Sequence, residues 1–206
     1  MTSSLPPSFS QAFKLIDDAH AQDPTAIDDL PQELHYARSM SRWLETRCPL
    51  ASPELQLACR AHHFRRWELP RSSFPMTRPG YLTWRAKQKS QAASKVVALL
   101  ASPTISPAIS PQSRDRVAAL VRKEGLSTDG ETQILEDVAC LVFLDDQLDD
   151  FAAREDLDEA KMVTILRKTW NKMTETGRQL ALGMTLSDKA RLMVAKALQE
   201  DMDAPL

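Results

Sequence analysis

The sequence predicts an all-α fold of about seven or eight helices. Glycine is scarce, at five residues in 206, and apolar and polar residues rarely alternate as they do in half-buried strands. Apolar residues recur instead at the three- and four-residue spacing of an amphipathic helix. The length suits a single domain over residues 1–206, with a flexible N-terminus at 1–8 and a frayed tail at 201–206.

The first helices have recognisable starts. We expect a helix over residues 9–20, then a polar connection, then a second helix that begins near Pro31, since proline suits a first turn. Ser52, Pro53 and Glu54 predict the start of a third helix, because a hydroxyl cap, a proline and an acid all favour that position.

The rest of the chain continues the helical pattern. Three prolines between Trp67 and Gly80 predict an ordered loop of functional length. The helix that begins at Gly130 is apolar nearly all round, which is typical of a central buried helix. Further helices are expected over residues 81–101, 114–123, 162–173 and 186–198.

Charge is unevenly distributed along the chain, although the net charge is only −2. The segment 54–91 carries eight cations, and from Leu57 onward Glu68 is the only acid in it. The segment 129–159 carries twelve acids and one base. The net charge excludes a protein that coats nucleic acid, but it leaves room for one cationic site. The eight cations are Arg60, Arg65, Arg66, Arg71, Arg78, Arg85, Lys87 and Lys89.

Aromatic residues interleave with these cations. Guanidinium groups and aromatic faces together suit a single-stranded nucleic acid, through phosphate neutralisation and base stacking. The alternative is a solvated basic surface whose aromatic side chains serve the core. The candidate binding residues are Arg65, Arg66, Trp67, Arg71, Arg78, Tyr81, Trp84 and Arg85.

Two pairs of adjacent residues are candidates for chemistry. His62 and His63 close an apolar helical pattern, and histidine transfers protons near neutral pH. Glu136 and Asp137 lie within the apolar helix from Gly130, where ionised carboxylates need partners. The alternative is that the histidines are satisfied core groups and that the acids pair with a base or favour a helix N-terminus.

The cysteines and the lengths of the apolar segments indicate the cellular compartment of the protein. Cys48, Cys59 and Cys140 form no CxxC pair, and an odd number of cysteines suits a reducing environment. No apolar run approaches the roughly 20 residues of a membrane span, and the N-terminus lacks the pattern of a secretory signal. We expect a cytoplasmic protein without a membrane partner.

One arrangement resembles the HD-domain metal phosphohydrolases. It consists of His35, then LACRAHHF, then LEDVACLVFL on a central helix. The resemblance implies an HD-like helical bundle, with His35, His62 and Asp137 at the positions of metal ligands. His63 stands where that family has an aspartate, so this chain lacks one carboxylate of the usual divalent-metal site.

A closer resemblance covers residues 9–182. The strings AHHFRRWELPRSSFPMTRPGYLTWR, LEDVACLVFL and LRKTWNKM are similar to a family of helical proteins of formerly unknown function, some labelled glutamyl-tRNA synthetases. Through that family the chain resembles the fungal arginine-containing cyclodipeptide synthases. The resemblance implies a transferase of natural product biosynthesis that uses arginyl-tRNA and a second aminoacyl-tRNA. An aminoacyl ester is already activated, so no cofactor is expected.

This resemblance suggests a role for each candidate. The cationic segment, with His35 nearby, would hold the acceptor end of tRNA, and His62 or His63 would carry a proton. A carboxylate pair matches the planar fork of an arginyl guanidinium, which favours Glu136 and Asp137, with Asp145 or Asp146 as substitutes. The nearby nucleophiles are Ser72, Ser73 and Cys59. Two alternatives stay open: an HD-type phosphohydrolase, and a non-catalytic module that binds RNA or another polyanion.

Overall fold

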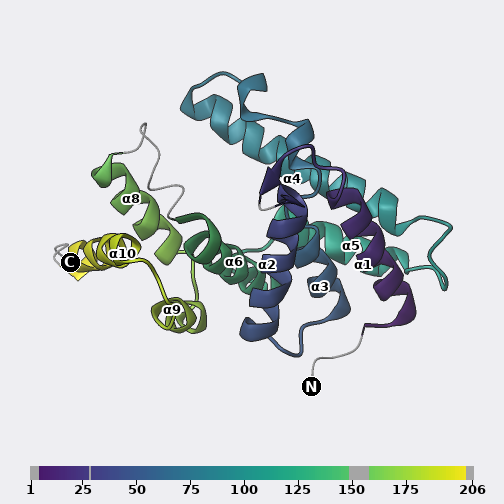
Figure 1. The fold of residues 1–206 in the computed structure, drawn as a ribbon. Coiled ribbons are helices and arrows are strands. Elements are labelled where there is room, and N and C mark those ends of the chain that lie inside the picture. The colour runs from purple at the N-terminus through teal and green to yellow at the C-terminus, as the bar shows by residue number, and fades with distance from the viewer. Residues whose placement is uncertain (1–4, 28, 149–157, 203–206) are drawn as a thin grey trace. The chain divides into compact units, whose positions relative to one another are not determined.

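The computed structural model describes residues 5–27, 29–148 and 158–202. These residues are all-α, as predicted, apart from one short pair of strands (Figure 1). The chain forms two compact units, Met1–Leu135 and Glu136–Leu206, and the expected single domain stays a prediction. No helix in the described ranges combines the length and the apolar character that a bilayer crossing requires.

The first unit contains most of the expected helices. The predicted connection after residue 20 also contains two strands, which pair antiparallel with Ala26 opposite Pro31 and Ile27 opposite Leu30. The predicted loop 67–80 contains two short 3-10 helices, η1 and η2. In order, the elements are α1 (Pro7–His20), β1 (Ala26–Ile27), β2 (Leu30–Pro31), α2 (Gln32–Arg47), α3 (Pro53–Arg60), η1 (Arg66–Glu68), η2 (Arg71–Ser73), α4 (Arg78–Leu100), α5 (Pro111–Arg122) and the start of α6 (Gly130–Val142).

Local sequence explains where these helices begin. Ser52 caps α3 as predicted, because its hydroxyl accepts a hydrogen bond from Leu55 N at 3.1 Å. Thr77 caps α4 in the same way through Gly80 N at 3.2 Å. A side chain at Gly80 would collide with the carbonyl of Pro75, so glycine lets the loop fold back onto the first turn of α4.

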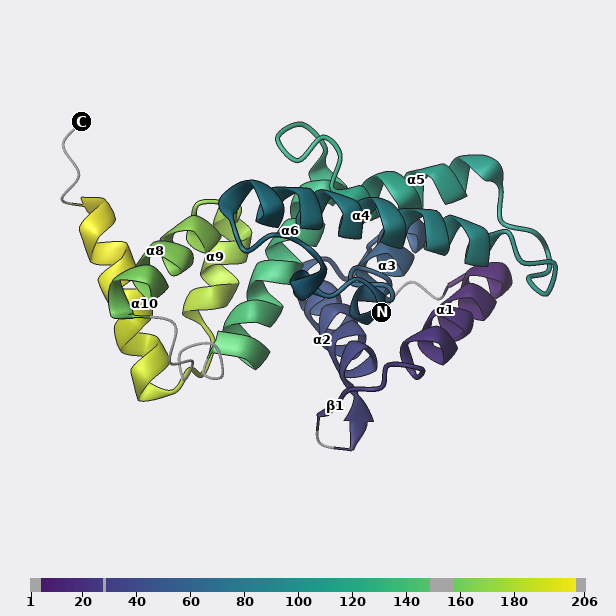
Figure 2. The same cartoon turned by 90° about the horizontal axis from the view of Figure 1, so that it is seen from above.

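The core of the first unit is built around α4, which packs along α5 and also contacts α1 (Figure 2). Helix α3 packs against α5 and α2, and its Leu55, Leu57 and Cys59 are completely buried. Burial raises the pKa of the Cys59 thiol, so this predicted nucleophile stays protonated. The start of α4 is more open, and Leu82 is exposed there.

The second unit contains the rest of α6 and four further elements. Helix α8 packs against α10, and Leu148, Met162 and Leu166 are buried in this unit. Helix α9 has no counterpart in the sequence prediction. Asp149 and Asp150, two of the twelve acids of segment 129–159, lie outside the described residues. The further elements are the π-helix η3 (Phe143–Gln147), α8 (Glu159–Trp170), α9 (Glu175–Leu182) and α10 (Asp188–Met202).

Candidate functional site

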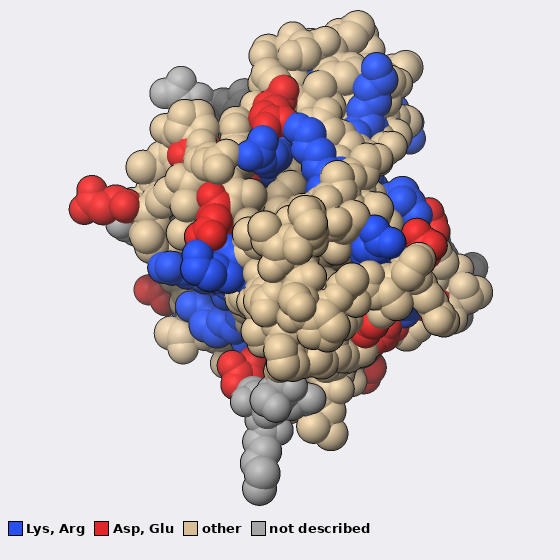
Figure 3. Space-filling model, turned by 90° about the vertical axis from the view of Figure 1, so that its right-hand side faces the viewer, with Lys and Arg blue, Asp and Glu red and all other residues tan. Residues whose placement is uncertain are grey.

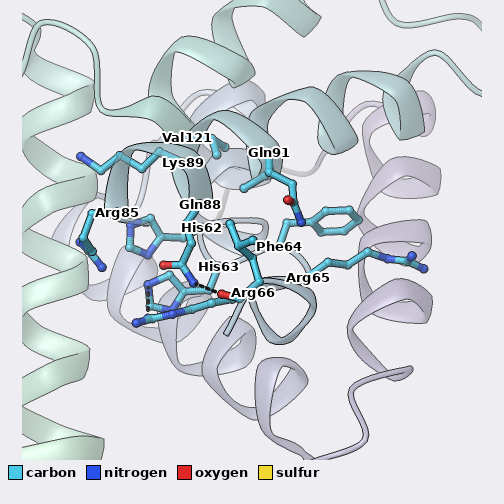
Figure 4. A pocket seen from close by; sticks show the side chains of 12 residues that line it. His62, His63, Phe64, Arg65, Arg66, Arg85, Gln88, Lys89, Gln91 and Val121 are labelled. Carbon is cyan, nitrogen blue, oxygen red and sulfur yellow. Dashed lines mark hydrogen bonds between the residues drawn. The ribbon is translucent and has the colours of Figure 1, made fainter. Parts of the chain in front are cut away.

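A pocket opens in the first unit between the turn after α3 and the middle of α4 (Figure 4). It encloses about 440 Å³ of space, part of which is open to solvent. Leu69, Ala92 and Val121 form apolar parts of its wall. Its polar lining includes six residues of the cation-rich segment: His62, His63, Arg65, Arg66, Arg85 and Lys89.

The turn after α3 directs several side chains into the pocket, and the buried carboxylate of Glu33 stabilises this turn. Arg65 has the left-handed backbone angles φ 53° and ψ 41°, which cost free energy for a residue other than glycine. Glu33, on α2, accepts a hydrogen bond from the backbone nitrogen of Arg65 at 2.8 Å and another from that of Arg66. The sequence does not reveal this anchor, because Glu33 lies more than thirty residues away.

Glu33 has a second buried partner that sequence analysis missed. His20 Nδ1 lies 2.9 Å from the Glu33 carboxylate, and His20 Nε2 lies 3.0 Å from the carbonyl of Arg60. Both neighbours offer oxygen acceptors to the ring. These buried polar contacts tie α1, α2 and the end of α3 together.

His62 and His63 form a stack with Tyr36 of α2. The Tyr36 and His63 ring centroids are 4.2 Å apart, and those of His62 and His63 are 4.5 Å apart. The Tyr36 hydroxyl lies 2.9 Å from His62 Nδ1. Burial, with the positive charge of Lys123, holds the pKa of His62 well below its usual value. Burial, with Arg66 and Arg85, does the same to the pKa of His63. Both imidazoles are therefore neutral at pH 7, and each has a nitrogen that accepts a hydrogen bond.

Arginine side chains complete this side of the pocket. The Arg66 guanidinium lies 3.2 Å from His63 Nε2 and 5.2 Å from the centre of the Trp84 ring. Burial and the nearby charge of Arg85 lower the pKa of Arg66. In Figure 4 Arg85 extends from α4 toward the two imidazoles, whereas Arg65 points away from them. Arg65 donates instead to Glu68, at 3.0 Å, and to Gln22.

Two of the predicted binding residues serve the fold. Trp84 is only 7% exposed, and its indole N–H donates to the carbonyl of Leu69 at 2.9 Å. Its ring is therefore a platform for Arg66, not a free surface for a nucleic acid base. Arg71 donates to the carbonyls of Phe74 and Pro75, at 3.0 Å and 2.7 Å, so it holds the loop before α4 together.

The other predicted binding residues do not line the pocket. Tyr81 is 45% exposed, and Arg78 is also exposed at the start of α4. Trp67 on η1 and His35 on α2 are half-buried. On the face seen in Figure 3, Lys and Arg side chains gather in separate groups with acidic side chains beside several of them. This face is therefore not uniformly cationic.

The predicted carboxylates lie in the second unit. Asp137 is completely buried and accepts hydrogen bonds from Thr174 N at 2.7 Å and from Thr174 Oγ1 at 2.5 Å. It thereby fixes the N-cap of α9. Glu136 is buried with Lys172 Nζ 3.6 Å from its Oε1. Asp145 is exposed on η3.

The surroundings of His62 and His63 do not fit the metal site that the HD resemblance implies. In the described part of the chain no group of three or more His, Cys, Asp or Glu side chains is placed to hold a metal ion. The charges that lower the pKa of both rings come from Arg66, Arg85 and Lys123. Such a positive environment disfavours a divalent cation, whereas it favours an anion.

Comparison with known proteins gives one match. The family model described as a domain of unknown function (DUF4202) matches residues 10–194. No curated protein matches the chain, and neither does any solved structure.

Proposed function

The chain belongs to the DUF4202 family, and we propose that this member makes an arginine-containing cyclodipeptide from arginyl-tRNA and a second aminoacyl-tRNA. The sequence resemblance over residues 9–182 suggests the reaction. The observation that carries the proposal is the pair of neutral imidazoles, His62 and His63, beside the guanidinium of Arg66 in one pocket. Proton acceptors and fixed cations are what ester aminolysis on a polyanionic carrier needs.

The tRNA acceptor end would bind along the cationic segment. Arg66, Arg85 and Lys89 would neutralise its phosphates at the pocket. Tyr81, which is 45% exposed at the start of α4, offers a ring on which a base can stack. Trp84 would act indirectly, by holding Arg66 in position. Because the aminoacyl ester is already activated, the reaction needs no nucleotide hydrolysis.

The first chemical step is aminolysis of one ester by the other amino acid. The α-amine of one aminoacyl-tRNA attacks the ester carbonyl carbon of the other, and a C–N bond replaces the C–O bond to ribose. The amine loses a proton and the departing ribose oxygen gains one. His62 or His63, neutral at pH 7, would accept the first proton and return it to the leaving oxygen. The product is a dipeptidyl-tRNA.

The second step closes the ring. The free α-amine of the dipeptidyl group attacks the remaining ester, which releases the second tRNA and leaves a diketopiperazine. The amine and the ester belong to one molecule, so this attack is intramolecular, and confinement of both ends in one pocket would orient them and lower the entropic cost further. A covalent enzyme intermediate is not needed in this scheme, and Cys59, whose thiol pKa is raised by burial, is a poor candidate to form one.

The carboxylates singled out in the sequence remain the proposed receptors for the arginyl guanidinium. Asp137 accepts hydrogen bonds from Thr174 through both of its oxygens, so Glu136 is preferred, and it would exchange its contact with Lys172 for the guanidinium. Asp145, exposed on η3, is the second choice. A carboxylate at either position would bind the two parallel N–H donors of the guanidinium.

Reconstitution tests the proposal. Purified protein is incubated with tRNA, aminoacyl-tRNA synthetases, ATP, arginine and a mixture of the other amino acids, and products are identified by mass spectrometry. We expect an arginine-containing cyclic dipeptide that disappears when ribonuclease is added. RNA binding without any product would establish the non-catalytic module instead, and metal-dependent release of phosphate from a nucleotide would establish the phosphohydrolase.

Two glutamate-to-glutamine variants test whether Glu136 binds the arginine side chain. Glu136→Gln should abolish the arginine-containing product, because the amide no longer offers two equivalent acceptors. Glu175→Gln removes the same charge from an exposed position of the second unit and should leave product formation unchanged. Normal product from the folded Glu136→Gln protein would exclude Glu136 as the receptor.

A further inference from the structure

Several arginines of the first unit are paired with a carboxylate, whereas two arginines of the pocket are not. Arg60 pairs with Asp17 at 2.6 Å, Arg65 with Glu68 at 3.0 Å, and Arg116 with Asp129 at 2.6 Å. Among the described residues of the first unit, no carboxylate forms an ion pair with the side chain of Arg66 or Arg85. These two guanidinium groups therefore have no carboxylate in direct contact among the described residues of the first unit, although the charge of Glu33 acts on Arg66 from a distance.

The fold also holds these two charges near each other. Arg66 comes from η1 and Arg85 from α4, and both line the same pocket with Lys89 (Figure 4). The charge of Arg85 is one of the reasons why the pKa of Arg66 is lowered, so the two guanidinium groups repel each other. Arg66 is held by the Trp84 ring and by His63 despite this repulsion. An anion between the two groups would relieve it.

The neighbouring groups suit an anion that accepts hydrogen bonds from several directions. Gln88 and Gln91 line the same pocket, and Leu69, Ala92 and Val121 form its apolar wall. The apolar wall lowers the local dielectric constant and thereby strengthens each charge interaction. A planar carboxylate fills one guanidinium fork, whereas the oxygens of a phosphate point in different directions and can serve Arg66 and Arg85 together.

We propose that the pocket is a phosphate-binding site in which Arg66 and Arg85 bind the oxygens of one phosphate group, with Lys89 at its edge and the His62–His63 stack beside it. This site deepens the proposed function, and only the assignment of the phosphate to a tRNA 3′ end rests on that function. A free mononucleotide is the other source of the same group.

Binding at this site is coupled to protons. The groups that act on the stack are Tyr36 of α2, Arg66 of η1, Arg85 of α4, Lys123 at the end of α5 and, for His63, also His20 of α1. The cations among them disfavour a protonated imidazole in the free protein. A bound phosphate offsets their charge, so it should raise the pKa of His62 or His63 and draw a proton onto the stack.

Titration calorimetry of the full chain tests the site with four probes: inorganic phosphate, AMP, adenosine and the RNA trinucleotide CCA. We expect AMP to bind and adenosine, which has no phosphate, to bind at least tenfold more weakly, on the order expected for charged hydrogen bonds. Measurements in two buffers of different ionisation enthalpy give the net proton exchange near pH 7. After the protons released by the AMP phosphate itself are accounted for, the protein should show proton uptake. CCA binding at least as tight as AMP would support an RNA end as the source, and a preference for AMP would support a free nucleotide.

A matched pair of variants on α4 gives the control. Arg85→Met should weaken AMP binding about tenfold, whereas Lys87→Met, the same charge change at an exposed residue outside the pocket, should change it less than about threefold. Arg85→Lys should recover part of the affinity. Equal effects of the two methionine variants, or equal binding of adenosine and AMP, would each overturn the site.

The same measurements separate this site from the proposed reaction. If AMP binds as described but reconstitution yields no cyclic dipeptide, the phosphate site stands and the proposed function fails. If the cyclic dipeptide forms while Arg85→Met changes neither AMP binding nor the KM for aminoacyl-tRNA, the function stands and the phosphate site fails.

Discussion

The carboxylate of Glu33 accepts a hydrogen bond from the backbone nitrogen of Arg65 at 2.8 Å, and Arg65 has left-handed backbone angles. The same carboxylate lies 2.9 Å from Nδ1 of the buried His20 ring. One acid of α2 therefore stabilises the turn that presents His62, His63 and Arg66 to the pocket. The geometry of the candidate site depends on a group that does not line it.

Replacing Glu33 should destabilise the protein. In Glu33→Gln the buried His20 ring and the backbone nitrogens of Arg65 and Arg66 lose a charged acceptor with two oxygens, which costs about 1–3 kcal/mol. Urea unfolding followed by circular dichroism measures the loss. Glu45→Gln changes the same charge at an exposed position of α2 and should stay within about 0.5 kcal/mol of the parent. Equal stability of the two variants would contradict the anchoring role of Glu33.

A methyl group at Gly177 should also destabilise the fold. It would lie 2.7 Å from Cγ of the buried Asp137, so Gly177→Ala should cost about 1–3 kcal/mol by overpacking. Gly130→Ala places a methyl group where no atom lies within 4 Å, and we expect it to be neutral or slightly stabilising. Unfolding free energies of both variants measure the difference. A Gly177→Ala protein as stable as the parent would show that Asp137 and α9 separate at little cost.

The stability of the protein should fall as the pH drops below about 6.5, the ordinary pKa of histidine. The pKa values of His62 and His63 are depressed in the folded state, so the unfolded chain binds more protons between the folded and unfolded values. Stability from these groups is complete above pH 6.5 and is lost at lower pH, by at most about 1.4 kcal/mol per pH unit for each histidine. Urea midpoints from pH 8 to pH 5 measure the slope. His63→Gln should flatten it, and an unchanged slope would argue against a neutral His63.

Replacing Trp84 by phenylalanine should lower the stability. Trp84→Phe loses the 2.9 Å hydrogen bond to the carbonyl of Leu69, which still accepts from Gln88, and it puts a smaller ring in the place of a buried indole. We expect a loss of about 1–3 kcal/mol in unfolding free energy. Tyr81→Phe, at a 45% exposed ring, should change the free energy of unfolding by less than about 0.5 kcal/mol. A larger loss of stability in Tyr81→Phe than in Trp84→Phe would contradict the assignment of Trp84 to the core and of Tyr81 to the exposed surface.

Much of the fold was predictable because its signals are local. The Ser52 cap, the start of α6 at Gly130 and the helical period of the apolar residues each lie within one segment. Helix α9 was missed because it has only eight residues, and its start depends on Asp137, thirty-seven residues before Thr174. The strand pair was missed because it joins only two residues on each side.

The candidate site was only partly predictable. His62, His63, Arg66 and Arg85, which the sequence indicated as separate candidates for proton transfer and for anion binding, line one pocket. The burial of Trp84 could not be read from its spacing, because an aromatic residue among cations fits both a core and a surface. The pairing of Arg65 with Glu68 and Gln22 depends on the direction in which its side chain leaves the turn, and residue type alone does not encode that direction.

The Arg66 guanidinium lies over the Trp84 indole, and this contact gives the protein its own optical reporter. A cation over an indole alters the fluorescence of that ring, so a ligand that draws Arg66 away would change the emission. Trp84 is one of four tryptophans, and Trp84→Phe would identify its share of the signal. Ligand binding in the pocket can thus be measured in unlabelled protein by stopped-flow tryptophan fluorescence.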